Sequence, residues 1–151
     1  MKILPADYAD LGRILEIQKA AYQSEAKLYN DYSIPPLTQT LEELQAEFGT
    51  TTILKAIVES EIVGSVRLVL EGDTVLLGRL IVDPAWQGKG YGAALLNAAD
   101  TAFPEAKSIE LFTGSRSSWN IRFYEQHGYV ITHEKPLSDI VTLVYLRKKL
   151  R

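Results

Sequence analysis

The hydrophobic residues of this chain follow helical spacing in some segments and strand-like runs in others. Between Asp7, which is suited to cap a helix, and Gln23, apolar positions recur on one helical face. The residues that would form this buried face are Leu11, Ile14, Leu15, Ile17 and Ala21. Thr40 opens a T-L-E-E pattern typical of a capping box, which predicts a second short helix ending at Gly49. Residues 28–37 break the spacing with Asn-Asp and Pro-Pro pairs and are expected to form a loop.

Strand patterns dominate the rest of the chain. Ile3-Leu4 predicts a short first strand, and the β-rich stretch 51–82 contains two predicted hairpin turns, Glu59-Ser60-Glu61 and Glu71-Gly72-Asp73. The remaining predicted elements are a strand over 75–82, a helix ending near Phe103, a strand over 108–114, a helix over 117–127, and a hairpin over 129–136 and 139–148. The order β-α-α-β-β-β-α-β-α-β-β predicts a mixed α/β domain, antiparallel at first, with a parallel crossover after strand 75–82.

Length and composition predict one domain over residues 1–151, with 46% hydrophobic residues, 23% charged residues and a net charge of −3. The only basic cluster, Arg147-Lys148-Lys149 with Arg151, is small, which argues against nucleic acid as a partner. No apolar run approaches the roughly 20 residues that span a bilayer, so no membrane partner is expected. The chain has no cysteine, which excludes disulfides and thiolate metal sites. No metal is expected, and the cytoplasm is the expected location.

The most informative stretch is GRLIVDPAWQGKGYGAALLNAA, residues 78–99. An apolar strand-like run stops at Asp83-Pro84, a glycine-rich turn follows at 87–92, and an Ala/Leu-rich helical pattern then begins. This arrangement points free backbone N–H groups and the positive end of a helix dipole at one spot, which is typical of phosphate-binding sites. Glycine at a helix start also serves backbone geometry alone, so the spacing of the turn decides between these functions.

Two nucleotide-binding patterns do not fit that spacing. A P-loop requires G-x-x-x-x-G-K-[ST], whereas here Lys89 precedes Gly90 and no Ser or Thr follows. A dinucleotide fingerprint requires G-x-G-x-x-G in the first strand–helix turn and an acid after the next strand. Here the spacing is G-x-G-x-G in mid-chain, and the next predicted strand ends in Thr113-Gly114.

A third pattern does fit. Q-x-x-G-x-G, from Gln87 through Gly90 to Gly92 after a strand ending in V-D-P, resembles the acyl-CoA-binding motif of the GNAT superfamily of N-acetyltransferases. Downstream, SSWNIRFYEQHGYV resembles that family's N-x-x-x-Y helix and the glycine–aromatic pair after it, here Asn120, Tyr124, Gly128 and Tyr129. The predicted element order also resembles the family's over nearly the whole chain. The stretch YQSEAKLYNDYSIPPLTQTLEEL resembles a bacterial subgroup and implies no substrate.

The resemblance implies acetyl-CoA as co-substrate and a GNAT-like fold. In this fold the strand before the glycine turn splays from its parallel neighbour, and its free backbone groups pair with the pantetheine arm of CoA. The N–H groups of the turn would hold the CoA pyrophosphate, with Lys89 adding charge. The implied cofactor-binding residues are Leu80, Ile81, Val82, Gln87, Gly88, Lys89, Gly90, Tyr91, Gly92, Ala93, Ser117, Asn120 and Tyr124.

The resemblance also implies roles in acetyl transfer by direct attack of an amine on the thioester. The backbone N–H of Val82 is the implied donor to the oxyanion, and Tyr124 is the candidate general acid for the departing thiolate. A phenol with a pKa of about 10 is protonated at neutral pH, as this role requires. Asn120 is expected to hydrogen-bond the cofactor, with Ser117 as the alternative.

The general base and the acceptor stay open. The strand before the turn carries Leu77-Gly78-Arg79 where many members carry a glutamate. Glu110 on the next strand is one candidate base, unless it faces solvent or pairs with Arg79, and a water chain is another. Glu25, Tyr29 and Asp31 are implied to face the acceptor, a primary amine of a small molecule or peptide. A non-catalytic acyl-CoA-binding or sensing domain is the alternative function, and a homodimer is common in the superfamily.

Overall fold

One seven-stranded sheet runs through the computed structural model, which describes residues 1–151. The strands lie in the order β1-β2-β3-β4-β5-β7-β6, and every neighbouring pair is antiparallel except β4 and β5. The strands are β1 (Lys2–Pro5), β2 (Thr52–Val58), β3 (Glu61–Glu71), β4 (Thr74–Val82), β5 (Ser108–Gly114), β6 (Val130–Pro136) and β7 (Thr142–Lys149). The predicted mixed α/β class and the parallel crossover are therefore confirmed.

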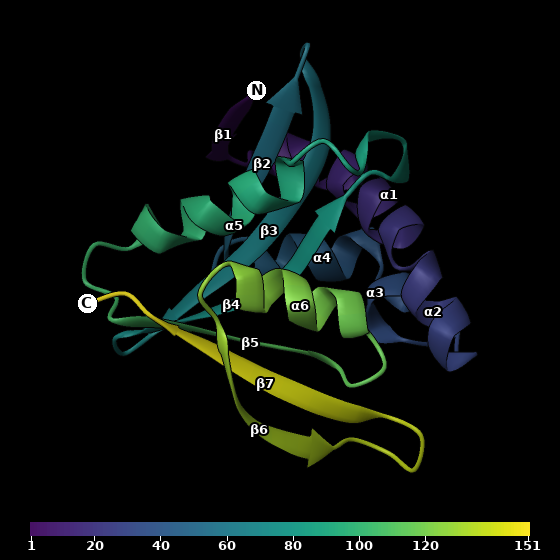
Figure 1. The fold of residues 1–151 in the computed structure, drawn as a ribbon. Coiled ribbons are helices and arrows are strands. Elements are labelled where there is room, and N and C mark those ends of the chain that lie inside the picture. The colour runs from purple at the N-terminus through teal and green to yellow at the C-terminus, as the bar shows by residue number, and fades with distance from the viewer.

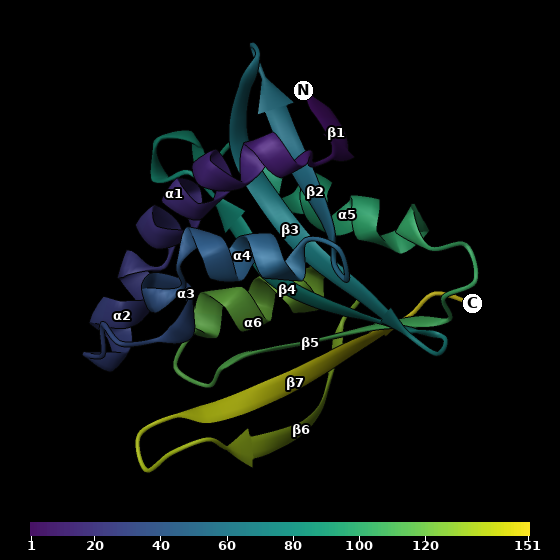
Figure 2. The same cartoon turned by 180° about the vertical axis from the view of Figure 1, so that it is seen from behind.

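Helices lie on both faces of this sheet. Figure 1 shows α5 and α6 in front of it, and Figure 2 shows the N-terminal helices on the opposite face, where β5, β7 and β6 carry no helix. The helices are α1 (Leu11–Ala21), α2 (Gln23–Tyr29), α3 (Pro35–Thr38), α4 (Leu41–Glu47), α5 (Tyr91–Ala102) and α6 (Ser118–Gln126), with 3-10 turns η1 (Tyr8–Asp10) and η2 (Pro84–Trp86). None of the helices combines the length and the apolar character needed to cross a membrane.

Each face of the sheet has its own apolar core. The helix α5 packs on β1, β2, β3 and β4, and its Leu95, Leu96 and Ala99 are buried in an apolar cluster that continues into β5 and β7, with residues of α6 at its edge. On the other face, Ile14 and Leu15 of α1 pack with residues of α4 and β2. Burial of these two helix faces accounts for the amphipathic spacing seen in the sequence.

Local signals in the sequence fold as expected. In the capping box of α4, the Glu43 N–H donates to Thr40 Oγ1 at 3.1 Å and the Thr40 N–H donates to Glu43 Oε1 at 2.9 Å. Both predicted hairpin turns are present, with positive φ at Glu59, Ser60 and Gly72.

The N-terminal helical region differs from the prediction. Asp7 begins the 3-10 turn η1 instead of α1, and α1 ends at Ala21, after which a separate helix α2 runs to Tyr29. The predicted loop contains the short helix α3, because Ile34 is extended and Pro35 occupies the first helical position, where a missing N–H costs nothing. The helix α2 follows directly after α1 (Figure 2), and its Glu25 contacts Ser117 at the start of α6.

Candidate active site

The site lies where the two parallel strands separate. β4 and β5 pair over only three positions, from Thr74–Ser108 to Leu76–Glu110. Beyond these positions β4 continues to pair with β3 up to Val82, and β5 pairs with β7 along its whole length. Figure 1 shows the two strands starting together and then diverging. The carboxyl-terminal part of β4 therefore has one edge without a partner strand.

The ladder geometry shows which backbone groups face that free edge. The Asp83 N–H donates to the Val63 carbonyl at 2.7 Å, so this opposed pair is hydrogen-bonded. Hydrogen-bonded and non-hydrogen-bonded pairs alternate in an antiparallel ladder, which makes Ser65–Ile81 a bonded pair and Gly64–Val82 a non-bonded pair. The Val82 N–H therefore points away from β3 and toward the gap, whereas the backbone groups of Ile81 are used within the sheet.

The glycine turn borders this edge with left-handed backbone. Gly88 has φ +78° and Gly90 has φ +88°, a region in which side chains are disfavoured. Gly90 is the N-cap of α5, and the first helical bond comes from the Ala94 N–H to the Gly90 carbonyl. The N–H groups of residues 91–93 consequently have no partner within the helix. They lie at the positive end of a twelve-residue helix.

A cavity of about 250 Å³ joins the turn to the strand end. Its lining residues are Val82, Trp86, Gln87, Gly88, Gly90, Tyr91, Gly92, Ala93 and Phe123. Most of them were predicted from the glycine motif, but Trp86 and Phe123 were not. A signal for Trp86 was available in its position next to the turn, whereas Phe123 comes from α6 and no local pattern places it there.

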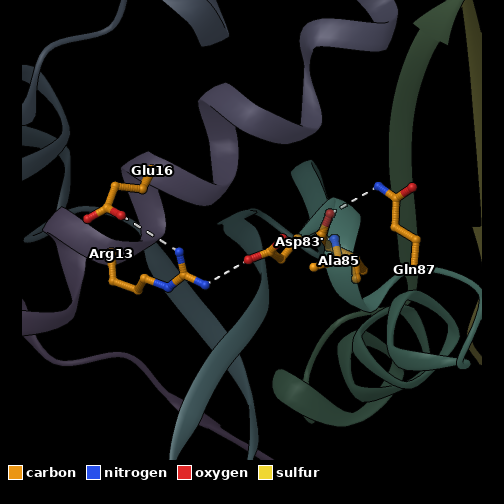
Figure 3. A network of polar contacts seen from close by, with 6 residues as sticks. Arg13, Glu16, Asp83, Ala85 and Gln87 are labelled. Atoms are coloured by element: carbon orange, nitrogen blue, oxygen red, sulfur yellow. Dashed lines mark hydrogen bonds and ion pairs between the residues drawn. The ribbon is translucent and has the colours of Figure 1, made fainter.

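Polar contacts hold the turn against the strand and against α1 (Figure 3). Asp83 accepts hydrogen bonds from the Ala85 N–H at 3.0 Å and from Arg13 at 2.7 Å, and Arg13 also lies 3.7 Å from Glu16. These bonds lower the pKa of Asp83, and the bond from the Ala85 N–H has the largest effect. Gln87 Nε2 donates to the Val82 carbonyl at 3.1 Å. The glutamine of the Q-x-x-G-x-G motif thus braces the turn against the last residue of β4.

Tyr124 lies on α6, next to Phe123, which lines the cavity. Its ring packs against Phe123 and Tyr129, with centroid distances of 5.5 and 5.8 Å. Burial raises the pKa of Tyr124, and the neighbouring Tyr22 and Glu25 raise it further. The phenol therefore stays protonated at neutral pH.

Three residues predicted for different tasks meet in one contact. The Ser117 hydroxyl donates to Glu25 Oε1 at 2.7 Å, and Asn120 Nδ2 donates to the same oxygen at 3.1 Å. Ser117 is completely buried. The implied cofactor ligands Ser117 and Asn120 thus bind the implied acceptor residue Glu25, which ties α2 to α6. Both bonds use Oε1, and Glu25 Oε2 makes no hydrogen bond within the protein.

The other two implied acceptor residues have local structural contacts. The buried Tyr29 hydroxyl accepts a hydrogen bond from the Arg116 N–H at 2.9 Å and lies against Gly114, where a Cβ would collide with it. Asp31 accepts hydrogen bonds from the side chain and the backbone of Ser33, which lower its pKa. Neither contact brings a free polar group to the gap.

Glu110 lies at the closed end of the gap, opposite Leu76. Its carboxylate is partly exposed and lies 3.7 Å from the Arg147 guanidinium. It forms no ion pair with Arg79, the alternative partner considered from the sequence. It helps to line a second, smaller cavity of about 150 Å³, together with Leu76, Leu77, Leu111, Phe112 and Tyr145. No group of three or more His, Cys, Asp and Glu side chains is arranged to hold a metal ion.

Comparison with known families decides what this arrangement is. The family model of the GNAT acetyltransferase domain matches residues 49–131, which is more than half of the chain. The chain belongs to the GNAT acetyltransferase family. The matched segment contains the diverging strands, the glycine turn and Tyr124. The protein is therefore an acetyltransferase of mixed α/β fold.

Solved structures share the fold of this GNAT protein. They include the PaiA N-acetyltransferase from Thermoplasma acidophilum in complex with coenzyme A (TM-score 0.79, 19% identity, 99% of each chain covered). YncA from Salmonella typhimurium with its cofactor acetyl-CoA has TM-score 0.79 and 20% identity, over 100% of this chain and 94% of that chain. The ribosomal-protein-S18-alanine N-acetyltransferase from Escherichia coli has TM-score 0.81 and 16% identity, over 99% and 93%. No curated protein sequence matches significantly.

Proposed function

We propose that this GNAT protein transfers the acetyl group of acetyl-CoA to a primary amine of a small molecule or peptide, with residues 1–151 acting as one domain. One observation carries the proposal. The unpaired end of β4, through Val82, and the glycine turn, through Gly88 and Gly90, line the same cavity. A phosphate-binding turn next to a free strand edge suits a ligand with a pyrophosphate at one end and an amide-containing arm at the other.

The residues around this cavity fit coenzyme A. The free N–H groups at the start of α5 would bind the pyrophosphate, and the exposed Lys89 would add charge from the solvent side. The free edge of β4 would hold the pantetheine arm through Leu80 and Val82. Acetyl-CoA supplies an activated thioester, so the protein has to orient it, polarise its carbonyl and handle two protons.

The proposed reaction forms a bond between the amine nitrogen and the acetyl carbon while the carbon–sulfur bond breaks. The Val82 N–H donates to the carbonyl oxygen, which becomes more negative as the amine attacks. Tyr124 gives its proton to the departing thiolate, and the amine gives up a proton to a base. We propose Glu110 as that base, because it lies opposite Leu76 at the last paired position before the strands diverge and its carboxylate has only a long contact with the half-exposed Arg147.

Glutamine variants distinguish Glu110 from the other candidate bases, Glu25 and a water chain. Glu110→Gln should lower kcat about 100-fold while leaving acetyl-CoA affinity unchanged, because only the base is lost. Glu25→Gln is the matched control, since it removes the other carboxylate near the gap. A loss of kcat confined to Glu25→Gln would assign the base to Glu25, and no loss in either variant would favour a water chain.

Binding and turnover test the function itself. Isothermal titration should show acetyl-CoA binding, and release of free thiol in the presence of a panel of amines and peptides should identify an acceptor. Absence of binding would refute the proposal. Tight binding without thiol release for any amine would favour the alternative, an acyl-CoA-binding or sensing domain.

Two further expectations from the sequence remain proposals. We propose a cytoplasmic location, because a chain without cysteine is compatible with a reducing compartment. We also propose a homodimer. Size-exclusion chromatography with light scattering tests the assembly, and a monomer mass at high protein concentration would contradict it.

A further inference from the structure

Arg79 occupies a strained position beside the gap. Across β3 and β4, Ser65 faces Ile81 and Arg67 faces Gly78, so β4 carries one extra residue at 79–80. Arg79 itself has φ +49°, a left-handed conformation that non-glycine residues rarely adopt in a strand. Such strain persists only where the surroundings enforce it, and it is concentrated at functional sites. The bulge turns the Arg79 guanidinium toward Tyr22, on the face that carries the N-terminal helices.

Arg79 has no direct anionic partner, because the carboxylate of Glu47 acts on it only at a distance and is paired with Arg67. The Nε of Arg79 is buried without a hydrogen-bond partner, and none of the ion pairs of the protein includes it. Its neighbour below the guanidinium is the neutral Tyr22 ring, with a centroid distance of 6.0 Å. The Arg67 side chain lies next to Gly78, the residue before Arg79, but Arg67 forms its own ion pair with Glu47 at 2.8 Å. Burial of the guanidinium also lowers the pKa of Arg79.

A half-buried guanidinium without an anionic partner is costly unless a ligand supplies one. We propose that the acceptor amine of this enzyme also carries a carboxylate, and that Arg79 binds that carboxylate. The proposal rests on the acetyl-transfer function proposed above and names its substrate class. Guanidinium and carboxylate match in geometry, since two N–H groups can donate to the two oxygens.

The surroundings of Arg79 suit a zwitterionic acceptor with an apolar body. The small cavity at the closed end of the gap is lined mainly by apolar side chains, among them Leu76 and Leu77 on the same strand as Arg79. Glu110 borders the same cavity and carries the opposite charge to Arg79. A carboxylate at Arg79 would supply the anion that the guanidinium lacks, and the apolar lining of the cavity suits an apolar body. Apolar amino acids such as leucine and phenylalanine are therefore suitable probes.

The first test uses matched acceptors that differ only in the carboxylate. Leucine, leucinamide and 3-methylbutylamine share the amine and the apolar body, and phenylalanine, phenylalaninamide and phenethylamine form a second set. We expect kcat/KM for each amino acid to exceed that of its amide and its amine by about tenfold or more. Equal or faster acetylation of the amides or amines would overturn the carboxylate proposal while leaving acetyl transfer intact.

The second test asks whether Arg79 causes the preference for amino acids over their amides and amines. Arg79→Gln should remove the preference for amino acids, mainly through KM, whereas Arg122→Gln, an exposed change on α6, should keep it. A preference that survives Arg79→Gln would overturn the proposal. Turnover is not needed for a third readout, binding of N-acetylleucine against N-acetylleucinamide to the CoA-loaded protein by isothermal titration. The proposal predicts that N-acetylleucine binds more strongly than N-acetylleucinamide and that Arg79→Gln removes this difference. Equal binding of the two compounds, or no binding of either, overturns it.

Discussion

Tyr124 illustrates how far a single residue can be understood from sequence and from structure. Its place in the N-x-x-x-Y pattern predicted a general acid, but the sequence alone does not tell a buried phenol from an exposed one. The structure adds that Tyr124 packs between two aromatic rings and that burial raises its pKa. The phenol is thus available as a proton donor over the whole range in which the thiolate has to be protonated.

Replacing Tyr124 with Phe removes that proton and little else. We expect kcat to fall about 100-fold with a similar affinity for acetyl-CoA, because the change acts on the leaving thiolate. Since the pKa of Tyr124 is raised, the wild type should show no loss of activity from Tyr124 ionisation below a pH of about 10. Steady-state kinetics across pH checks both statements. An alkaline decline below that pH, present in the wild type and absent in Tyr124→Phe, would contradict the raised pKa.

At the scale of elements, the sequence predicted most strands and helices but not their irregularities. The hairpins, the glycine turn and the capping box of α4 follow from local residue chemistry. The break at Tyr22 and the bulge at Arg79 do not, because one extra residue in a strand leaves no trace in a hydrophobic pattern. Those two irregularities bring Tyr22 and Arg79 together, so the part of the site that we propose selects the acceptor was missed.

The glycines of the turn should behave differently from one another. A Cβ at Gly90 meets no atom within 4 Å, but φ is +88°, so Gly90→Ala should cost about 1 kcal/mol of stability and weaken acetyl-CoA binding. At Gly92 a Cβ makes ordinary contact with Val82 and Phe123, and Gly92→Ala should stabilise α5 by up to about 1 kcal/mol. It should nevertheless weaken binding if the pyrophosphate lies against this residue. Urea unfolding and isothermal titration measure the two effects separately.

Gly12 supplies the control for this comparison. It lies in α1, away from the turn, and a Cβ added there would meet no atom within 4 Å. Gly12→Ala should therefore increase stability as Gly92→Ala does and leave acetyl-CoA affinity unchanged. Unchanged affinity in both turn variants would mean that the phosphate groups bind elsewhere.

At the scale of the whole molecule, the site is assembled from segments far apart in the chain. Glu25 contacts Ser117 and Asn120, which are 92 and 95 residues later, and Arg13 contacts Asp83, which is 70 residues later. No local pattern predicts such contacts, which explains why Glu25 and Ser117 were assigned to separate tasks from the sequence. What the sequence predicted well was the conformation of the glycine turn, because its residues are consecutive in the chain.

The contact between α2 and α6 should be measurable as stability. Glu25→Ala leaves Ser117 and Asn120 without an acceptor, and because Ser117 is completely buried we expect a loss of about 2 kcal/mol. Glu25→Gln keeps an acceptor oxygen and should cost about 1 kcal/mol or less. Glu16→Ala, on an exposed face of α1, is the control and should be nearly neutral. Equal urea midpoints for Glu25→Ala and Glu16→Ala would show that the contact of Glu25 with Ser117 and Asn120 contributes nothing to stability.

Three tyrosines with raised pKa values couple the stability of the fold to alkaline pH. Burial raises the pKa values of Tyr22, Tyr124 and Tyr129 above the usual value of about 10. As pH rises above about 10, the unfolded chain loses these protons before the folded protein does, so fewer protons are bound in the unfolded state. Stability should therefore be fully present below that pH and decline above it, by up to about 1.4 kcal/mol per pH unit for each tyrosine.

Tyr129 separates this effect from general alkaline denaturation. Its hydroxyl is buried without a hydrogen-bond partner, so Tyr129→Phe removes an unsatisfied polar group and should raise stability by about 1 kcal/mol at neutral pH. It also removes one of the three titrating groups, so the decline above a pH of about 10 should become shallower. Tyr32→Phe, at an exposed position, should change neither quantity. Urea unfolding at neutral pH and at a pH just above 10 provides the comparison, and identical alkaline slopes for the wild type and Tyr129→Phe would show that the decline originates elsewhere.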